Sequence, residues 1–197
     1  MVEFEQQWLH QARRAAFEDY RQRRVSTWIG LRGASMRPLI GPDTWMQVEF
    51  GATEFAIGDI ILFPLGNMLV AHRIVADKLR QRQLALVPKG DAEPYPDPLI
   101  QPSEVLGAVR ALRHGRHGSI TLFGCTGTPA RIVAAISRSL GRVAALLRRL
   151  AMILPDPPRR LALNAIPPLI RVVAHVILAP LFWATRLDMS KQESGRR

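Results

Sequence analysis

Cysteine and acidic side chains are scarce in this 197-residue sequence. The one cysteine, Cys125, excludes a disulfide within the chain, and without a matched histidine and amide pattern it is expected to be a packed core residue. Asp and Glu number 16 against 27 Lys and Arg, so the net charge at pH 7 is +11. Hydrophobic residues make up 48%, which excludes a disordered chain and supplies a core for one domain with additional helices.

The N-terminal region lacks a long apolar run. Residues 3–24 combine an apolar stripe with arginines at other positions, which predicts a helix in the segment 1–24. No uninterrupted apolar stretch of signal-peptide or membrane-spanning length occurs there. We therefore expect neither a signal peptide nor an N-terminal membrane anchor.

The basic surplus lies in residues 119–197, which hold 12 Lys and Arg against 3 Asp and Glu. Such a surplus attracts phosphate, either of anionic lipid or of nucleic acid. The spacing in residues 130–153 predicts an amphipathic helix. Its apolar stripe is Ile132, Ile136, Leu140, Val143, Leu147 and Leu150, and its basic stripe is Arg131, Arg138, Arg142 and Arg149. This pattern favours either a helix at a membrane surface or a helix that covers the β region or a partner with its arginines in water.

Residues 161–184 are long enough to span a bilayer, but two prolines, an arginine and a histidine interrupt them. We expect a bent helix at the membrane interface with Trp183 near its end, or a buried helix of an oligomer. Residues 186–197 are expected to form a polar tail. These features predict attachment to an anionic membrane surface, with the cytoplasmic face as one option, and make nucleic acid the less favoured partner.

Between residues 25 and 112, short β-branched and aliphatic runs alternate with Gly, Pro and Asp. This alternation predicts a compact, mostly antiparallel β domain. The expected strands cover residues 45–50, 59–63, 68–76, 83–87 and 105–112.

Five blocks in this region stand in a fixed order, beginning with the sequence Gly-Ala-Ser-Met-Arg-Pro around Ser35. A serine hydroxyl is almost unreactive at neutral pH unless a general base removes its proton, and His72 is the candidate for that base. The blocks cover residues 33–38, 57–63, 70–75, 89–91 and 105–109.

In this order the blocks resemble those of the signal peptidase I family of serine peptidases and of the related self-cleaving repressors of the SOS response. The resemblance covers roughly residues 30–112, and it implies the coiled β fold of signal peptidases and cleavage of a protein or peptide precursor after a small side chain. Bacterial housekeeping members and the repressors place a lysine base on the strand that matches residues 70–75, whereas the endoplasmic-reticulum and archaeal type places histidine followed by arginine. Here that pair is His72-Arg73, so the resemblance is to the Ser/His type.

The resemblance implies that Ser35 is the nucleophile and His72 its base. Asp91 and Asp97 compete to orient His72, and Asp97 is preferred because it has the spacing of the third catalytic residue of the endoplasmic-reticulum type. Either carboxylate is also a candidate for capping turn N–H groups. Gly33 stands where many signal peptidases have a serine that assists the oxyanion hole. Glycine at this position resembles the repressor branch instead. The backbone N–H of Ser35 is then the oxyanion donor that remains.

The predicted fold class is α+β, with an N-terminal helix (1–24), a mostly antiparallel catalytic β domain of signal-peptidase type (25–118) and a C-terminal region of basic amphipathic and apolar helices (119–197). The predicted function is a serine endopeptidase that uses the Ser35/His72 pair on a protein or peptide precursor. Alternatives are a cytoplasmic regulatory or inactive relative and a basic nucleic-acid-binding protein. No cofactor or metal is expected, because His114 and His117 have no carboxylate or thiolate cluster beside them.

Overall fold

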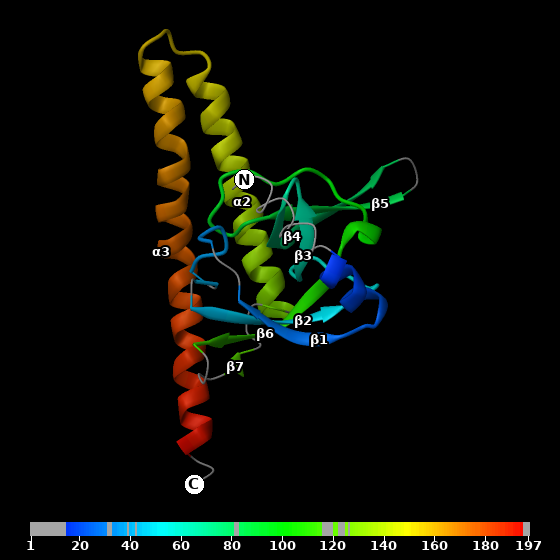
Figure 1. Cartoon of the computed structure of the whole chain (residues 1–197). Helices are drawn as coiled ribbons and strands as arrows, with labels where there is room; N and C mark the ends of the chain where they lie inside the picture. Colours follow the sequence, from blue (N-terminus) through cyan, green and yellow to red (C-terminus); the bar gives the residue numbers. More distant parts are fainter. Residues whose placement is uncertain are drawn as a thin grey trace, which may run out of the picture.

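An antiparallel sheet packs against a hairpin of two long helices in the computed structural model of the chain (Figure 1). The structure describes residues 15–30, 33–38, 40–41, 43–80, 83–115, 120–121, 125 and 127–194. The predicted α+β class and the mostly antiparallel sheet are confirmed. Residues 15–22 are helical, and the remainder of the predicted N-terminal helix, residues 3–14, lies outside the described residues.

Seven strands form the described sheet, and every pairing in it is antiparallel. They are β1 (Ser26–Gly30), β2 (Thr44–Phe50), β3 (Ile60–Leu65), β4 (Met68–Arg80), β5 (Gln83–Lys89), β6 (Gly107–His114) and β7 (Ile120–Thr121). Their order is β1-β2-β6-β3-β4-β5, with β7 paired to β6. The five strands predicted from sequence correspond to β2 through β6.

Strand β3 is the centre of the core because both of its faces are covered. Successive strand side chains point to opposite faces, and the four consecutive residues 60–63 are all fully buried. Ile60 and Leu62 pack in one cluster with Val133 and Leu178 of the helices, whereas Ile61 and Phe63 pack in a second cluster on the other face. The sheet therefore has a helix face and an opposite face, and the helices share the core of the β region.

The two helices, α2 (Gly127–Ala151) and α3 (Pro158–Ser194), pack against each other along the seam that Leu140, Ala144 and Ile170 form. The predicted helix over residues 130–153 is confirmed, but only part of its predicted apolar stripe is buried. Leu140 is buried, and Ile136 and Leu147 are partly buried. Ile132, Val143 and Leu150 are exposed. The buried face consists mainly of small residues: Ala130, Val133, Ala134, Ser137, Leu140, Gly141, Ala144 and Ala151. Helix α2 is covered by strands on one side and by α3 on the other, and small side chains permit that close approach.

Helix α3 is longer than the sequence predicted. It continues through Pro167, Pro168 and Pro180 to residue 194, so most of the expected polar tail is helical. Within it, residues Pro158–Pro180 are long and apolar enough to cross a membrane, with a mean hydropathy of 1.8 and 22% of the segment buried. The Trp183 side chain lies outside the described residues. Figure 1 shows that the α2–α3 hairpin runs along one side of the sheet and that its tip extends beyond it.

Candidate active site

Ser35 lies in the turn after β1, where two buried hydrophobic side chains hold the chain. Met36 and Ile40 insert into the helix-face core cluster, and Ser35, directly before Met36, is left half-buried at the surface. The Ser35 carbonyl oxygen accepts a 2.8 Å hydrogen bond from the Ala92 N–H. Gly33 has a φ of +149°, which a residue with a Cβ rarely adopts. This backbone conformation explains why glycine fits at this position better than a serine.

His72 comes from the middle of β4, opposite Ile61 of β3. This register places its ring on the opposite face from the helices, edge-on to Phe63 with the ring centroids 6.2 Å apart. The Nε2 atom of His72 lies 2.9 Å from Ser35 Oγ, across 37 residues of sequence. The candidate nucleophile and base are thus in hydrogen-bond contact.

Asp97 completes this hydrogen-bonded chain. Its Oδ2 atom lies 2.6 Å from His72 Nδ1, and its own N–H donates to the Pro88 carbonyl oxygen at 2.9 Å. A carboxylate only accepts hydrogen bonds, so Nδ1 carries the proton and Nε2 is left to accept the Ser35 hydroxyl proton. The His72 and Asp97 side chains are only 7% and 15% exposed, which keeps water from competing for these bonds.

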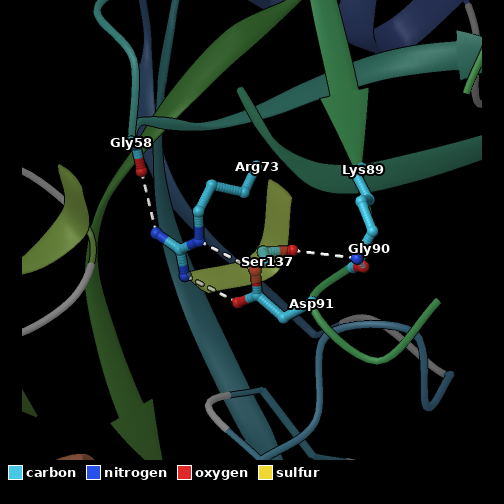
Figure 2. A network of polar contacts seen from close by, with 6 residues as sticks. All are labelled: Gly58, Arg73, Lys89, Gly90, Asp91 and Ser137. Carbon is cyan, nitrogen blue, oxygen red and sulfur yellow. Dashed lines mark hydrogen bonds and ion pairs between the residues drawn. The ribbon is translucent and has the colours of Figure 1, made fainter. Parts of the chain in front are cut away.

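Asp91, the other candidate carboxylate, belongs to a separate network on the helix face (Figure 2). Its two oxygens accept hydrogen bonds from Arg73 Nε at 2.9 Å and Nη2 at 2.7 Å. Arg73 Nη1 also donates to the Gly58 carbonyl oxygen at 2.8 Å. Both charged side chains are 0% exposed. Asp97 is therefore the carboxylate that contacts His72, whereas Asp91 forms a buried ion pair with Arg73.

A small cavity of about 60 Å³ opens beside Ser35. Its lining is mainly apolar and comes from the serine turn and from β4: Gly33, Ser35, Met36, Ile40, Leu69, Val70 and Ala71. One edge of β4 pairs with β3 along residues 68–73. On the other edge, the described strand β5 pairs with β4 only from Arg73 onward. An extended peptide could therefore pair with β4 next to the cavity.

Lys89 is a second buried cation, beside Arg73, and the sequence predicted no role for it. It ends β5 opposite Arg73, and its Nζ donates to the Gly90 carbonyl oxygen at 3.1 Å and to Ser137 Oγ of α2 at 2.9 Å (Figure 2). Burial lowers the pKa of Lys89 from 10.5 to about 8, against the attraction of Asp91, Glu93 and Asp97. The signal in the sequence was a lysine at the end of an apolar strand, which alone does not identify its partner.

The remaining candidates behave as packed or local residues. Cys125 is fully buried, and that burial raises the pKa of its thiol to about 12, so it is a core residue rather than a nucleophile. His114 Nδ1 lies 3.2 Å from Thr44 Oγ1, and His117 lies outside the described residues. Within the described ranges, no group of three or more His, Cys, Asp or Glu side chains could hold a metal ion.

Comparisons with known proteins add no relative: no family model, no curated protein and no solved structure matches this chain.

The lowered pKa of Lys89 predicts a pH dependence of stability. Between about pH 8 and 10.5 the unfolded chain holds a proton on Lys89 that the folded chain has lost, so this residue's contribution to the free energy of unfolding rises with pH. In urea unfolding, the free energy of unfolding of wild type minus that of Lys89→Met should therefore rise as the pH increases across this window, by up to roughly 3 kcal/mol. A difference that is constant from pH 7 to 10.5 would contradict the burial-lowered pKa.

Proposed function

We propose that this protein is a serine endopeptidase of signal-peptidase type that cleaves a protein or peptide precursor. The observation that carries the proposal is the hydrogen-bonded chain from Ser35 Oγ through His72 to Asp97, with distances of 2.9 and 2.6 Å. These three residue types in this order form an activated nucleophile, its base and the group that orients the base. The resemblance of the five sequence blocks to the Ser/His signal peptidases supports the same chemistry.

The reaction follows from the proton positions. Ser35 Oγ attacks the scissile carbonyl carbon while His72 Nε2 takes the hydroxyl proton, and Asp97 stabilises the imidazolium that forms. His72 then gives this proton to the leaving amine, so the C–N bond breaks and an ester to Ser35 remains. Water, deprotonated by His72, hydrolyses the ester and restores the Ser35 hydroxyl. The Ser35 N–H is the donor proposed for the oxyanion.

The cavity beside Ser35 supports a preference for substrates with a small apolar side chain. Its volume of about 60 Å³ and its lining of Met36, Ile40 and Leu69 suit a short apolar side chain. A substrate strand that pairs with residues 68–72 of β4 would run along Leu69, Val70 and Ala71 and present its scissile carbonyl near Ser35.

Attachment to an anionic membrane through the hairpin tip is the second part of the proposal. The hairpin tip, residues 150–161, carries five exposed apolar side chains: Leu150, Met152, Ile153, Leu154 and Leu161. Exposed arginines stand immediately beside them, at positions 148, 149 and 160. Apolar side chains that enter the lipid boundary, with arginines at the phosphate level, are the arrangement of interfacial helices.

The nucleophile prediction is tested by Ser35→Ala. Removing the attacking oxygen should lower the cleavage of small-residue peptide libraries on the order of 10⁴- to 10⁶-fold. Mass spectrometry of the products measures the rate, and urea unfolding checks the fold. Ser103 is an exposed serine in the short 3₁₀ helix Pro102–Glu104, so Ser103→Ala is the matched control and should cleave at the wild-type rate. A folded Ser35→Ala protein with wild-type cleavage would exclude the proposed chemistry.

The membrane prediction is tested with the full chain and a pair of tip substitutions. Ile153→Ser with Leu154→Ser should weaken sedimentation with phosphatidylserine-containing vesicles by roughly 10- to 100-fold, because two apolar side chains no longer enter the lipid. Leu79→Ser is the control, since Leu79 is 81% exposed and Ile153 is 80% exposed, but Leu79 lies on β4 away from the tip.

Salt separates the two candidate partners. Moderate salt should weaken vesicle binding only partly, because apolar insertion is not screened. If the full chain does not bind vesicles and instead binds duplex DNA with a steep salt dependence, the membrane proposal is wrong and the nucleic-acid alternative is supported.

A further inference from the structure

Residues 90–97 contact both ends of the Ser35–His72–Asp97 chain. At the start of this loop, a Cβ placed on Gly90 would lie 2.8 Å from the Ser35 carbonyl oxygen and 3.0 Å from Ser35 Cβ. Ala92 donates its N–H to the same carbonyl oxygen, and Asp97 at the far end contacts His72. A shift of this loop would therefore move the nucleophile and the residue that orients its base.

The start of the loop is attached to α2 through a buried polar contact. Lys89 Nζ bridges the Gly90 carbonyl oxygen and Ser137 Oγ, and both side chains are buried, at 1% and 0% exposed (Figure 2). One turn further along α2, Gly141 leaves room for the lysine stem, because a Cβ there would lie 3.3 Å from Lys89 Cε. Losing a hydrogen-bond partner is costly for a buried ammonium, so these two acceptors constrain the position of Lys89.

The same hairpin contacts the middle of the loop at two further points. Tyr95 packs into the seam between α2 and α3, with the Arg148 guanidinium 5.6 Å from its ring centroid. Glu93 forms an ion pair with Arg171 of α3 at 3.2 Å. The ion pair is exposed and contributes little by itself. Lys89 is the buried contact of the three and the one closest in sequence to Gly90.

We propose that Lys89 and Ser137 are positioning residues, through which helix α2 holds loop 90–97 so that Ser35 and Asp97 both meet His72. The expected effect on turnover rests on the proposed peptidase function. The expected effect on the contacts of His72 does not. Neither residue touches the reacting atoms. The helical hairpin is then part of the catalytic apparatus, and the β region alone does not contain everything that sets the geometry of the site.

The test compares Lys89→Met and Ser137→Ala, each of which removes the Lys89–Ser137 hydrogen bond, with Ser139→Ala as the matched control. Ser139 lies on the same helix but is exposed and donates only to the Ala135 carbonyl oxygen of its own helix. The geometric readout is the proton NMR signal of His72 Nδ1–H, which a short bond to the Asp97 carboxylate shifts far downfield. Asp97→Asn assigns this signal by abolishing it.

We expect the downfield signal to move upfield and to exchange faster with water in Lys89→Met and Ser137→Ala, and to stay unchanged in Ser139→Ala. The turnover number should fall about 10- to 100-fold in both variants with KM changed less than about twofold, because geometry and not substrate binding is lost. Should Lys89→Met fail to fold, Ser137→Ala decides, since it removes a single oxygen.

Folded variants that keep the wild-type His72 signal would overturn the positioning role, whatever their turnover. If the signal shifts as expected but the wild-type protein cleaves no peptide, the positioning role stands and the proposed peptidase function fails. The two proposals are thereby separated in one set of proteins.

Discussion

The buried ion pair between Arg73 and Asp91 is the interaction on which the site depends. Its two side chains have no exposure, and removing one partner of such a pair leaves an uncompensated charge that costs about 3 to 5 kcal/mol. Arg73 also donates to the Gly58 carbonyl oxygen. Gly58 packs closely on α2, because a Cβ placed on it would lie only 2.7 Å from the backbone of that helix. One guanidinium thus joins β4, the approach to β3 and the loop after β5.

The alternation of side chains along β4 separates structure from chemistry. His72 points to one face of the sheet and Arg73 to the other, because neighbouring strand residues face opposite ways. Loop 90–97 begins beside Lys89 and Arg73 on the helix face and ends at Asp97 beside His72. The loop therefore crosses from the face that α2 covers to the face that carries the candidate chemistry, and it connects α2 to Ser35 and His72.

The sequence predicted the strands better than the packing of the helices. Alternation and turn residues located β2 through β6. The resemblance singled out Ser35, His72 and Asp97, and the structure brings these three side chains within hydrogen-bond distance of one another in that order. On α2, periodicity favoured the large apolar residues Ile132 and Val143 for the buried face. The helix instead buries Ala, Gly and Ser, because it approaches β4 and α3 closely, and a periodic pattern does not show that approach. The Lys89–Ser137 contact spans 48 residues, and no local signal pairs them.

Turnover and unfolding free energy in Asp97→Asn and Asp91→Asn distinguish a carboxylate that orients His72 from one that stabilises the fold. We expect Asp97→Asn to lose on the order of 10⁴-fold in turnover and to stay within about 1 kcal/mol of wild-type stability. Asp91→Asn should instead lose about 3 kcal/mol or more of stability. A folded Asp97→Asn protein with wild-type turnover would show that Asp97 does not orient His72 for catalysis.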